Sequence, residues 1–105
     1  MGSKELAMSR RNGKKTKETK IIESLLKEHF PNYPKKYPPL ACRFTPNSIR
    51  VRLVHDSFRG KGLADRDDLV LPVIRKLPEK TQVDITMLLL FSPEEVNVPI
   101  VNLDF

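Results

Sequence analysis

Few side chains in this sequence have the types and spacing that catalysis or metal binding requires. Cys42 is the single cysteine, so an internal disulfide and a C-x-x-C metal or redox pair are both excluded. We expect its thiol to act as a small apolar filler. Asp65, Asp67 and Asp68 lie close together, but no nucleophile–base pair and no phosphate-binding loop accompanies them. The sequence therefore predicts a protein that is not an enzyme.

The basic side chains are the other group that suggests a function, because lysine and arginine bind phosphate groups. The formal net charge is +6, and residues 1–20 hold seven Lys or Arg against two Glu. Residues 35–61 hold seven more against Asp56 alone. This pattern predicts a basic face for nucleic-acid contact, although strand arginines can equally form a solvated surface without a ligand. The residues predicted to contact nucleic acid are Arg10, Arg11, Lys14, Lys15, Arg43, Arg50, Arg52, Arg59 and Lys61.

The elements that position these residues centre on a strand over residues 49–54. Apolar residues at 49, 51 and 53 alternate with Arg50 and Arg52, which indicates one buried face and two arginines that point outward. A second strand is predicted over residues 83–91, which are nearly all apolar. A connection of about 29 residues favours a parallel pair joined by a right-handed helical crossover.

A helix and a hairpin strand are predicted before this unit. Thr16 or Thr19 caps a helix that ends before Pro31. Residues 40–44 are predicted to form a short strand that turns back onto residues 49–54.

Prolines shape the crossover between the two central strands. Pro72 lacks an amide hydrogen and suits the first turn of a helix, so we expect two helices, near residues 62–70 and 72–78. Pro78 is expected to end the second of these helices. The resulting order, α-β-β-α-α-β, predicts an α+β sandwich of the type II KH-like fold, with a three-stranded mixed sheet and helices on one face.

The length of 105 residues has room for one small domain. We expect a disordered basic tail over residues 1–15, a folded domain over 16–97 and a C-terminal extension over 98–105, whose apolar residues cover a strand edge. No apolar run is long enough for a membrane span, and no signal peptide begins the chain. The sequence thus predicts a cytoplasmic protein, and we expect a monomer.

Within this framework, three blocks of residues resemble the BolA family, whose members read V-S-D-x-F-x-G-K-x-L-x-x-R-H-R-L-V and end in Y-T-P-E-E-W. The blocks are Val54-His55-Asp56-Ser57-Phe58-Arg59-Gly60-Lys61, then Leu63, Arg66, Leu69 and Val70, and finally Phe91-Ser92-Pro93-Glu94-Glu95. The resemblance covers about 75 residues and implies the same KH-like element order that the periodicities predict.

The resemblance implies a stress-response regulator that binds DNA, or a partner of monothiol glutaredoxins that shares a [2Fe-2S] cluster with them. Both histidine positions of the family are aspartates here, Asp67 and Asp84, and a carboxylate is a poor ligand for an iron–sulfur cluster. Together with Arg66 these residues become candidate partner contacts. Cys42 and His55 are the weak candidates for metal ligands, and we expect no cofactor.

Two hypotheses about function follow from these observations. The first is a non-enzymatic regulator that binds nucleic acid through the basic face and the N-terminal arm. The alternative is a protein-interaction adaptor that partners a monothiol glutaredoxin in iron–sulfur cluster handling.

Overall fold

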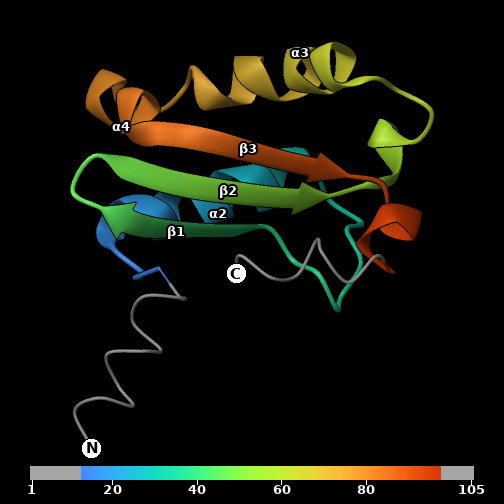
Figure 1. Cartoon of the computed structure of the whole chain (residues 1–105), viewed down its shortest axis with the longest axis horizontal. Helices are drawn as coiled ribbons and strands as arrows, with labels where there is room; N and C mark the ends of the chain where they lie inside the picture. Colours follow the sequence, from blue (N-terminus) through green and yellow to red (C-terminus); the bar gives the residue numbers. More distant parts are fainter. Residues whose placement is uncertain (1–12, 98–105) are drawn as a thin grey trace, which may run out of the picture.

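The computed structural model describes residues 13–97 as an α+β domain with a three-stranded mixed sheet and three α-helices (Figure 1). Residues 1–12 and 98–105, which include most of the predicted tail and all of the predicted extension, lie outside the described residues. In chain order the elements are α2 (Lys17–His29), β1 (Leu40–Thr45), β2 (Ser48–Val54), η1 (Asp56–Phe58), α3 (Leu63–Ile74), α4 (Glu79–Asp84), β3 (Ile85–Phe91) and η2 (Pro93–Asn97).

Helix α2 begins with both threonines that the sequence offered as caps. The Thr16 side chain accepts a hydrogen bond from the Thr19 amide, and the Thr19 side chain accepts one from the Thr16 amide. This capping box satisfies two amides at the start of the helix. Ile22 and Leu26 are fully buried, whereas Ile21 is 46% exposed, so α2 packs on the core through one narrow face.

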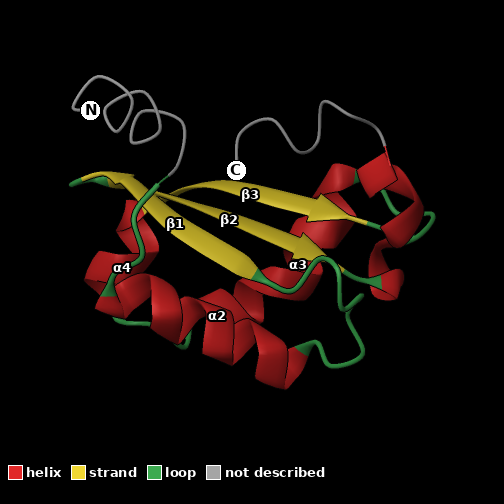
Figure 2. Cartoon of the chain, turned by 90° about the horizontal axis from the view of Figure 1, so that it is seen from below, coloured by secondary structure: helices red, strands yellow, loops and turns green. Residues whose placement is uncertain are grey.

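The sheet has the order β1-β2-β3. Strands β1 and β2 pair antiparallel as the predicted hairpin, and β2 and β3 pair parallel, which confirms the helical crossover between neighbouring strands. Figure 2 shows α2, α3 and α4 on the same face of the sheet. Beyond β1 the backbone of Lys14 pairs with that of Arg43, whereas no backbone segment within residues 13–97 pairs with the outer edge of β3.

The crossover helices differ from the prediction. Helix α3 continues through Pro72 to Ile74, because the burial of Val70, Val73 and Ile74 on both sides of the proline outweighs the loss of one backbone hydrogen bond. The second helix, α4, begins after Pro78 instead of ending there.

Strand β3 is also shorter than predicted. It begins at Ile85, because Val83 and Asp84 complete α4. Val83 is 72% exposed, so its apolar character did not indicate a buried position in the strand.

The core lies between the helices and the side of the sheet that faces them, the inner face. Ala41, Ile49, Val51 and Leu53 supply the sheet side of this core, and all four are fully buried. Their alternation along the strands leaves the intervening residues on the opposite side of the sheet, the outer face. The alternation of apolar and basic residues over 49–54 therefore predicted correctly which side chains of β2 lie on the inner face and which lie on the outer face.

Candidate functional site

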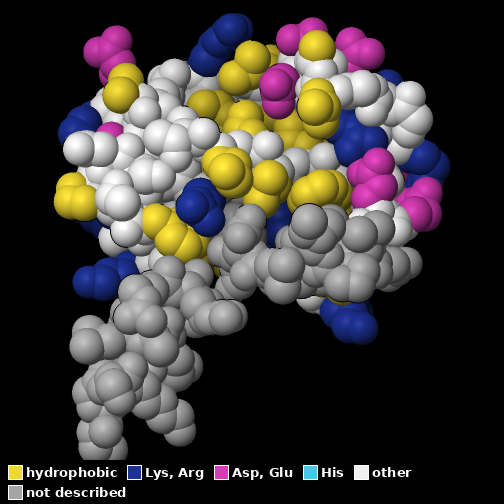
Figure 3. Space-filling model, in the orientation of Figure 1, with side chains coloured by type: hydrophobic (Ala, Val, Ile, Leu, Met, Phe, Trp, Pro, Cys, Tyr) yellow, Lys and Arg dark blue, Asp and Glu magenta, His cyan; other side chains and the backbone are white. Residues whose placement is uncertain are grey.

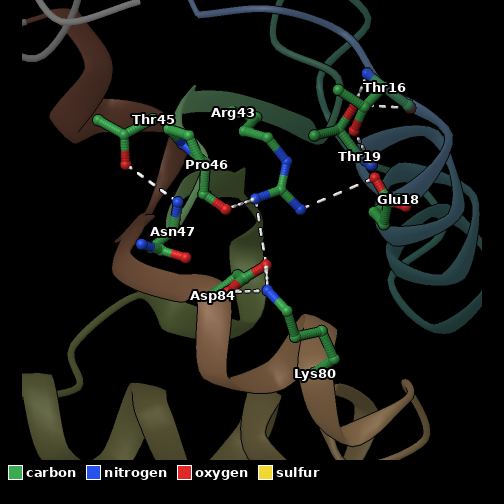
Figure 4. A network of polar contacts seen from close by, with 9 residues as sticks. All are labelled: Thr16, Glu18, Thr19, Arg43, Thr45, Pro46, Asn47, Lys80 and Asp84. Carbon is green, nitrogen blue, oxygen red and sulfur yellow. Dashed lines mark hydrogen bonds and ion pairs between the residues drawn. The ribbon is translucent and has the colours of Figure 1, made fainter.

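Arg43 is held in a network of ion pairs at the end of the sheet (Figure 4). Its Nη1 atom donates to the Pro46 carbonyl at 2.8 Å and to the Asp84 carboxylate at 3.1 Å. The Lys80 ammonium donates to both oxygens of the same carboxylate, at 3.0 and 3.1 Å. Hydrogen bonds from Lys80 and Arg43 lower the pKa of Asp84, whose side chain is only 4% exposed. The positive charge of Arg43 is therefore neutralised within the domain by the Asp84 carboxylate.

The register of the hairpin explains why Arg43 points into this network. Arg43 is opposite Ile49 and shares the inner face with it, whereas Cys42 is opposite Arg50 on the outer face. This placement corrects the expectation that Arg43 joins the strand arginines on one basic face. The sheet separates them.

Arg50 and Arg52 both lie on the outer face and contact aromatic rings. The Arg50 guanidinium carbon lies 4.3 Å from the centroid of the Phe44 ring, and that of Arg52 lies 5.5 Å from the Tyr37 ring. Arg52 is only 9% exposed, and burial lowers the pKa of its guanidinium. Arg52 thus points away from the helices, as predicted, but is not a solvated side chain.

The other predicted phosphate contacts differ in how much of their charge is available. Arg59 is paired with Glu94 at 2.5 Å and with Asp56 at 2.9 Å, which raises its pKa. Lys15 pairs with Glu23. Lys61 and Lys14 are exposed and have no ion pair within residues 13–97. Arg10 and Arg11 lie outside the described residues.

Arg66, a predicted partner contact, is instead a buried structural cation. It is 7% exposed and donates to the carbonyls of Lys61 and Leu90, both at 2.8 Å. Its two Nη atoms also donate to the Glu95 carboxylate, at 2.7 and 3.0 Å. This pair, with a hydrogen bond from the Ser92 amide, lowers the pKa of Glu95 to about 2. Sequence reasoning found both residues in the matched blocks but missed that they bind each other.

The two weak metal-ligand candidates do not form a site. Burial raises the pKa of the Cys42 thiol, and Gly13 packs directly against it, since a Cβ there would stand 2.6 Å from that of Cys42. His55 donates from Nε2 to the Pro31 carbonyl at 2.7 Å, so Nδ1 accepts from the Ser57 amide at 3.2 Å. Both ring nitrogens are engaged.

Their positions also keep the two candidates apart. Cys42 is opposite Arg50, and His55 follows β2 five residues later, a separation of about 16 Å along the strand. Asp84, at one of the two family histidine positions, is held in the ion pairs of Figure 4. Residues 13–97 contain no group of three potential ligands that could hold a metal, and Cys42 and His55 lie too far apart to bind the same iron–sulfur cluster.

A groove of about 300 Å³ follows the free edge of β3, between this strand and the helices α3 and α4. Its apolar lining includes Leu71 and Ile74 from α3 and Ile85 and Leu88 from β3. Among residues 13–97, Asp67 is the only charged residue of the lining. Hydrophobic side chains are visible beside the sheet and acidic side chains over α3 in Figure 3. Asp67 is thus a predicted partner contact that lines a hollow at the free edge of the sheet.

A larger hollow, of about 650 Å³, lies between α2, the β1–β2 turn and α4. Its charged lining includes Arg43, Lys80 and Asp84, which are bound to one another, and Glu18, which lies 3.7 Å from Arg43. These charges are therefore already paired within the domain. The β3 groove is the better candidate site, because the Asp67 carboxylate has no ion pair with any residue of 13–97.

Comparison with known proteins found no matching family model, no similar curated protein and no similar solved structure. No helix within residues 13–97 combines the length and the apolar composition needed to cross a bilayer.

Proposed function

We propose that this chain is a cytoplasmic, non-enzymatic adaptor of the BolA type, with the type II KH-like topology, that binds another protein along the edge of β3. The observation that carries the proposal is the groove beside that edge, whose lining combines apolar side chains with Gln82, Thr86 and the Asp67 carboxylate. The element order α-β-β-α-α-β and the mixed sheet support the topology.

An edge strand is a natural docking element for a partner in extended conformation. Alternate backbone N–H and C=O groups of such a strand point away from the sheet and can pair with an added strand. The side chains of the added strand would then reach the groove, where Leu71, Ile74 and Leu88 offer apolar contact. The backbone supplies affinity and the groove supplies specificity.

The charge of this edge sets the chemistry of the partner. Asp65, Asp67 and Asp68 lie within one turn of α3, and no Lys or Arg lines the groove within the described part of the chain. A segment with lysine or arginine beside apolar residues complements this surface. The resemblance to the BolA family suggests a monothiol glutaredoxin as the partner. No step through an iron–sulfur cluster is part of the proposal, because the residues described above do not fit one.

The test is an NMR titration of the isotope-labelled chain with a cluster-free monothiol glutaredoxin. We expect chemical-shift changes along residues 85–89 and at Asp67. Asp67→Lys should weaken binding about tenfold, which is 1.4 kcal/mol, because it places a cation in the groove. Asp68→Lys is the matched control, since Asp68 is exposed, is absent from the groove lining and makes the same charge change.

Two results would contradict the proposal. If shift changes appeared only on the outer face of the sheet, the edge of β3 would not be the binding site. If Asp67→Lys and Asp68→Lys weakened binding equally, the groove would have no specific role and only the net charge would matter.

Nucleic-acid binding is the second candidate, and one observation favours it. The backbone of Lys14 pairs with that of Arg43 at the β1 edge, and the neighbouring Cys42 is opposite Arg50 on β2. The cations of the N-terminal arm and Arg50 could contact phosphates together. A salt-titrated shift assay with mixed-sequence DNA and RNA, repeated after deletion of residues 1–12, tests this. An absence of binding at low salt would end this candidate.

A further inference from the structure

The larger hollow, of about 650 Å³ between α2, the β1–β2 turn and α4, combines apolar and charged side chains. Its apolar residues are Ile21 of α2, Pro46 of the turn, and Leu77 and Pro78 just before α4. Ile21 is 46% exposed, so a large aliphatic side chain of α2 faces solvent instead of the core. The volume falls within the range of about 300–1,000 Å³ that is typical of binding sites.

Four of the five charged residues that line this hollow among residues 13–97 neutralise one another. Figure 4 shows the Arg43 guanidinium between Glu18 of α2 and Asp84 of α4, and Lys80 binds the same Asp84 carboxylate. Lys17, the fifth, is exposed and has no ion pair within the described residues. The lining therefore carries an excess of one positive charge, which lies at the start of α2.

The exposed side of α2 adds to this positive charge. A second hollow, of about 420 Å³, lies along α2 and shares Lys17 and Ile21 with the first. Lys20 also lines it, is exposed and has no ion pair within residues 13–97. Glu28, in the last turn of α2, is the only carboxylate of this second lining in the described part of the chain. Ile21 is therefore bordered by two available lysines.

The lining indicates a protein partner rather than a nucleic acid. Bases stack on aromatic rings, and no aromatic residue lines either hollow among residues 13–97. Aliphatic side chains such as Ile21 and Leu77 instead match the leucine or isoleucine side chains of a protein. Lysines beside such contacts favour glutamate or aspartate on the partner. The occupant that fits both features is an acidic protein segment with apolar side chains.

The backbone around the hollow favours a partner in helical conformation. Helices α2 and α4 use most of their backbone N–H and C=O groups internally, and both groups of Lys14 pair with Arg43 beside β1. An extended partner would therefore leave its own polar groups unpaired against these helices. An amphipathic helix satisfies its own backbone and presents apolar side chains at every third and fourth position.

We propose that the hollow between α2 and α4 binds an acidic amphipathic helix of another protein. Leucine-like side chains of this helix contact Ile21 and enter the hollow, and its carboxylates lie beside Lys17 and Lys20. This site is separate from the edge of β3 and takes a partner of opposite charge, so each of the two sites can be tested without the other.

An NMR titration of the isotope-labelled full chain with a synthetic peptide tests this proposal. The peptide has about 18 residues, which is long enough to form a helix, with leucine on one face and glutamate and alanine elsewhere. We expect chemical-shift changes over residues 17–25 and 77–81 and none over residues 85–89. A second peptide, with lysine in place of every glutamate, should bind about tenfold more weakly.

Two pairs of variants locate the contact. Lys17→Glu should weaken binding of the acidic peptide about tenfold, and an acidic side chain at the start of α2 does not destabilise the helix. Lys27→Glu is the matched control, since Lys27 is exposed on the same helix and lines neither hollow. Ile21→Ala should weaken binding about fivefold, whereas Leu69→Ala, which truncates a side chain 39% exposed on α3, should have no effect.

The same measurements can overturn the proposal. Equal weakening by Lys17→Glu and Lys27→Glu would mean that only the net charge matters, and equal binding of the two peptides would exclude a role for the lysines. Shift changes confined to residues 85–89, or none at all, would exclude the hollow as the site. Changes over residues 17–25 with mixed-sequence RNA but not with the acidic peptide would identify a nucleic-acid site instead. Changes that follow the concentration of the chain alone would identify a second copy as the occupant.

Discussion

The buried pair of Arg66 and Glu95 should make the stability of the domain depend on pH in a defined window. Arg66 joins α3 to the end of β3 and to η2 through hydrogen bonds to Leu90 and Glu95. Replacing Glu95 with Gln keeps the shape of the side chain and removes its charge. A buried arginine would then face a neutral amide.

The size of the effect follows from the pKa of Glu95. It falls from an ordinary 4.5 to about 2, chiefly through the hydrogen bonds from Arg66. At about 1.4 kcal/mol per pKa unit, this corresponds to an upper bound of about 3 kcal/mol. The Glu95 side chain is 43% exposed, so solvent screening reduces the expected free energy to about 1.5 kcal/mol. Because the folded-state pKa is depressed, this stabilisation is present above pH 4.5 and is lost as the pH falls toward 2.

Urea unfolding followed by circular dichroism measures this effect. Glu95→Gln should lower the free energy of unfolding by about 1.5 kcal/mol at neutral pH and change it little near pH 2. Glu94→Gln is the matched control, because Glu94 and its partner Arg59 have side chains that are 57% and 54% exposed, and we expect no measurable change. Equal losses in the two variants, or a loss in Glu95→Gln that persists at low pH, would refute the reasoning.

Four further substitutions test the local arguments by the same unfolding measurement. Thr16→Ala removes the N-cap of α2 and should cost about 1 kcal/mol; a cost near zero would mean that the capping box adds nothing. Ile22→Ala should cost about 2–5 kcal/mol because Ile22 is fully buried, whereas Ile21→Ala should cost far less at a 46% exposed position. Pro72→Ala gives α3 a further amide donor and should stabilise the domain by about 1 kcal/mol or more, and a destabilised variant would contradict our account of the helix.

The sequence predicted the architecture well where one periodic signal dominated. The alternation over residues 49–54, the threonine caps and the length of the crossover led to the observed element order and to the neighbouring parallel strands. Each of these signals is local, or depends only on the number of residues between two strands. The crossover helices were misplaced because the effect of Pro72 depends on tertiary burial of its neighbours, which a propensity rule does not include.

The candidate site was harder to predict, because it depends on which charged groups meet in space. Asp67 was named from the sequence as a candidate partner contact, but the groove beside it depends on the relative positions of α3 and β3. Arg43 and Asp84 lie 41 residues apart and bind each other. A one-residue change in the hairpin register would have placed Arg43 on the outer face with Arg50, as the sequence suggested.

These ion pairs change what the net charge of +6 means for binding. The crossover brings the acidic second half of the chain against the basic middle, so carboxylates from residues 84–95 neutralise Arg43, Arg59 and Arg66 within the domain. Three carboxylates, Asp65, Asp67 and Asp68, lie on α3 beside the free strand edge, and no Lys or Arg lines the groove there within the described residues. A basic partner is therefore attracted to the edge of β3 while nucleic acid is repelled from it, so added salt should weaken the two kinds of binding at two separate surfaces.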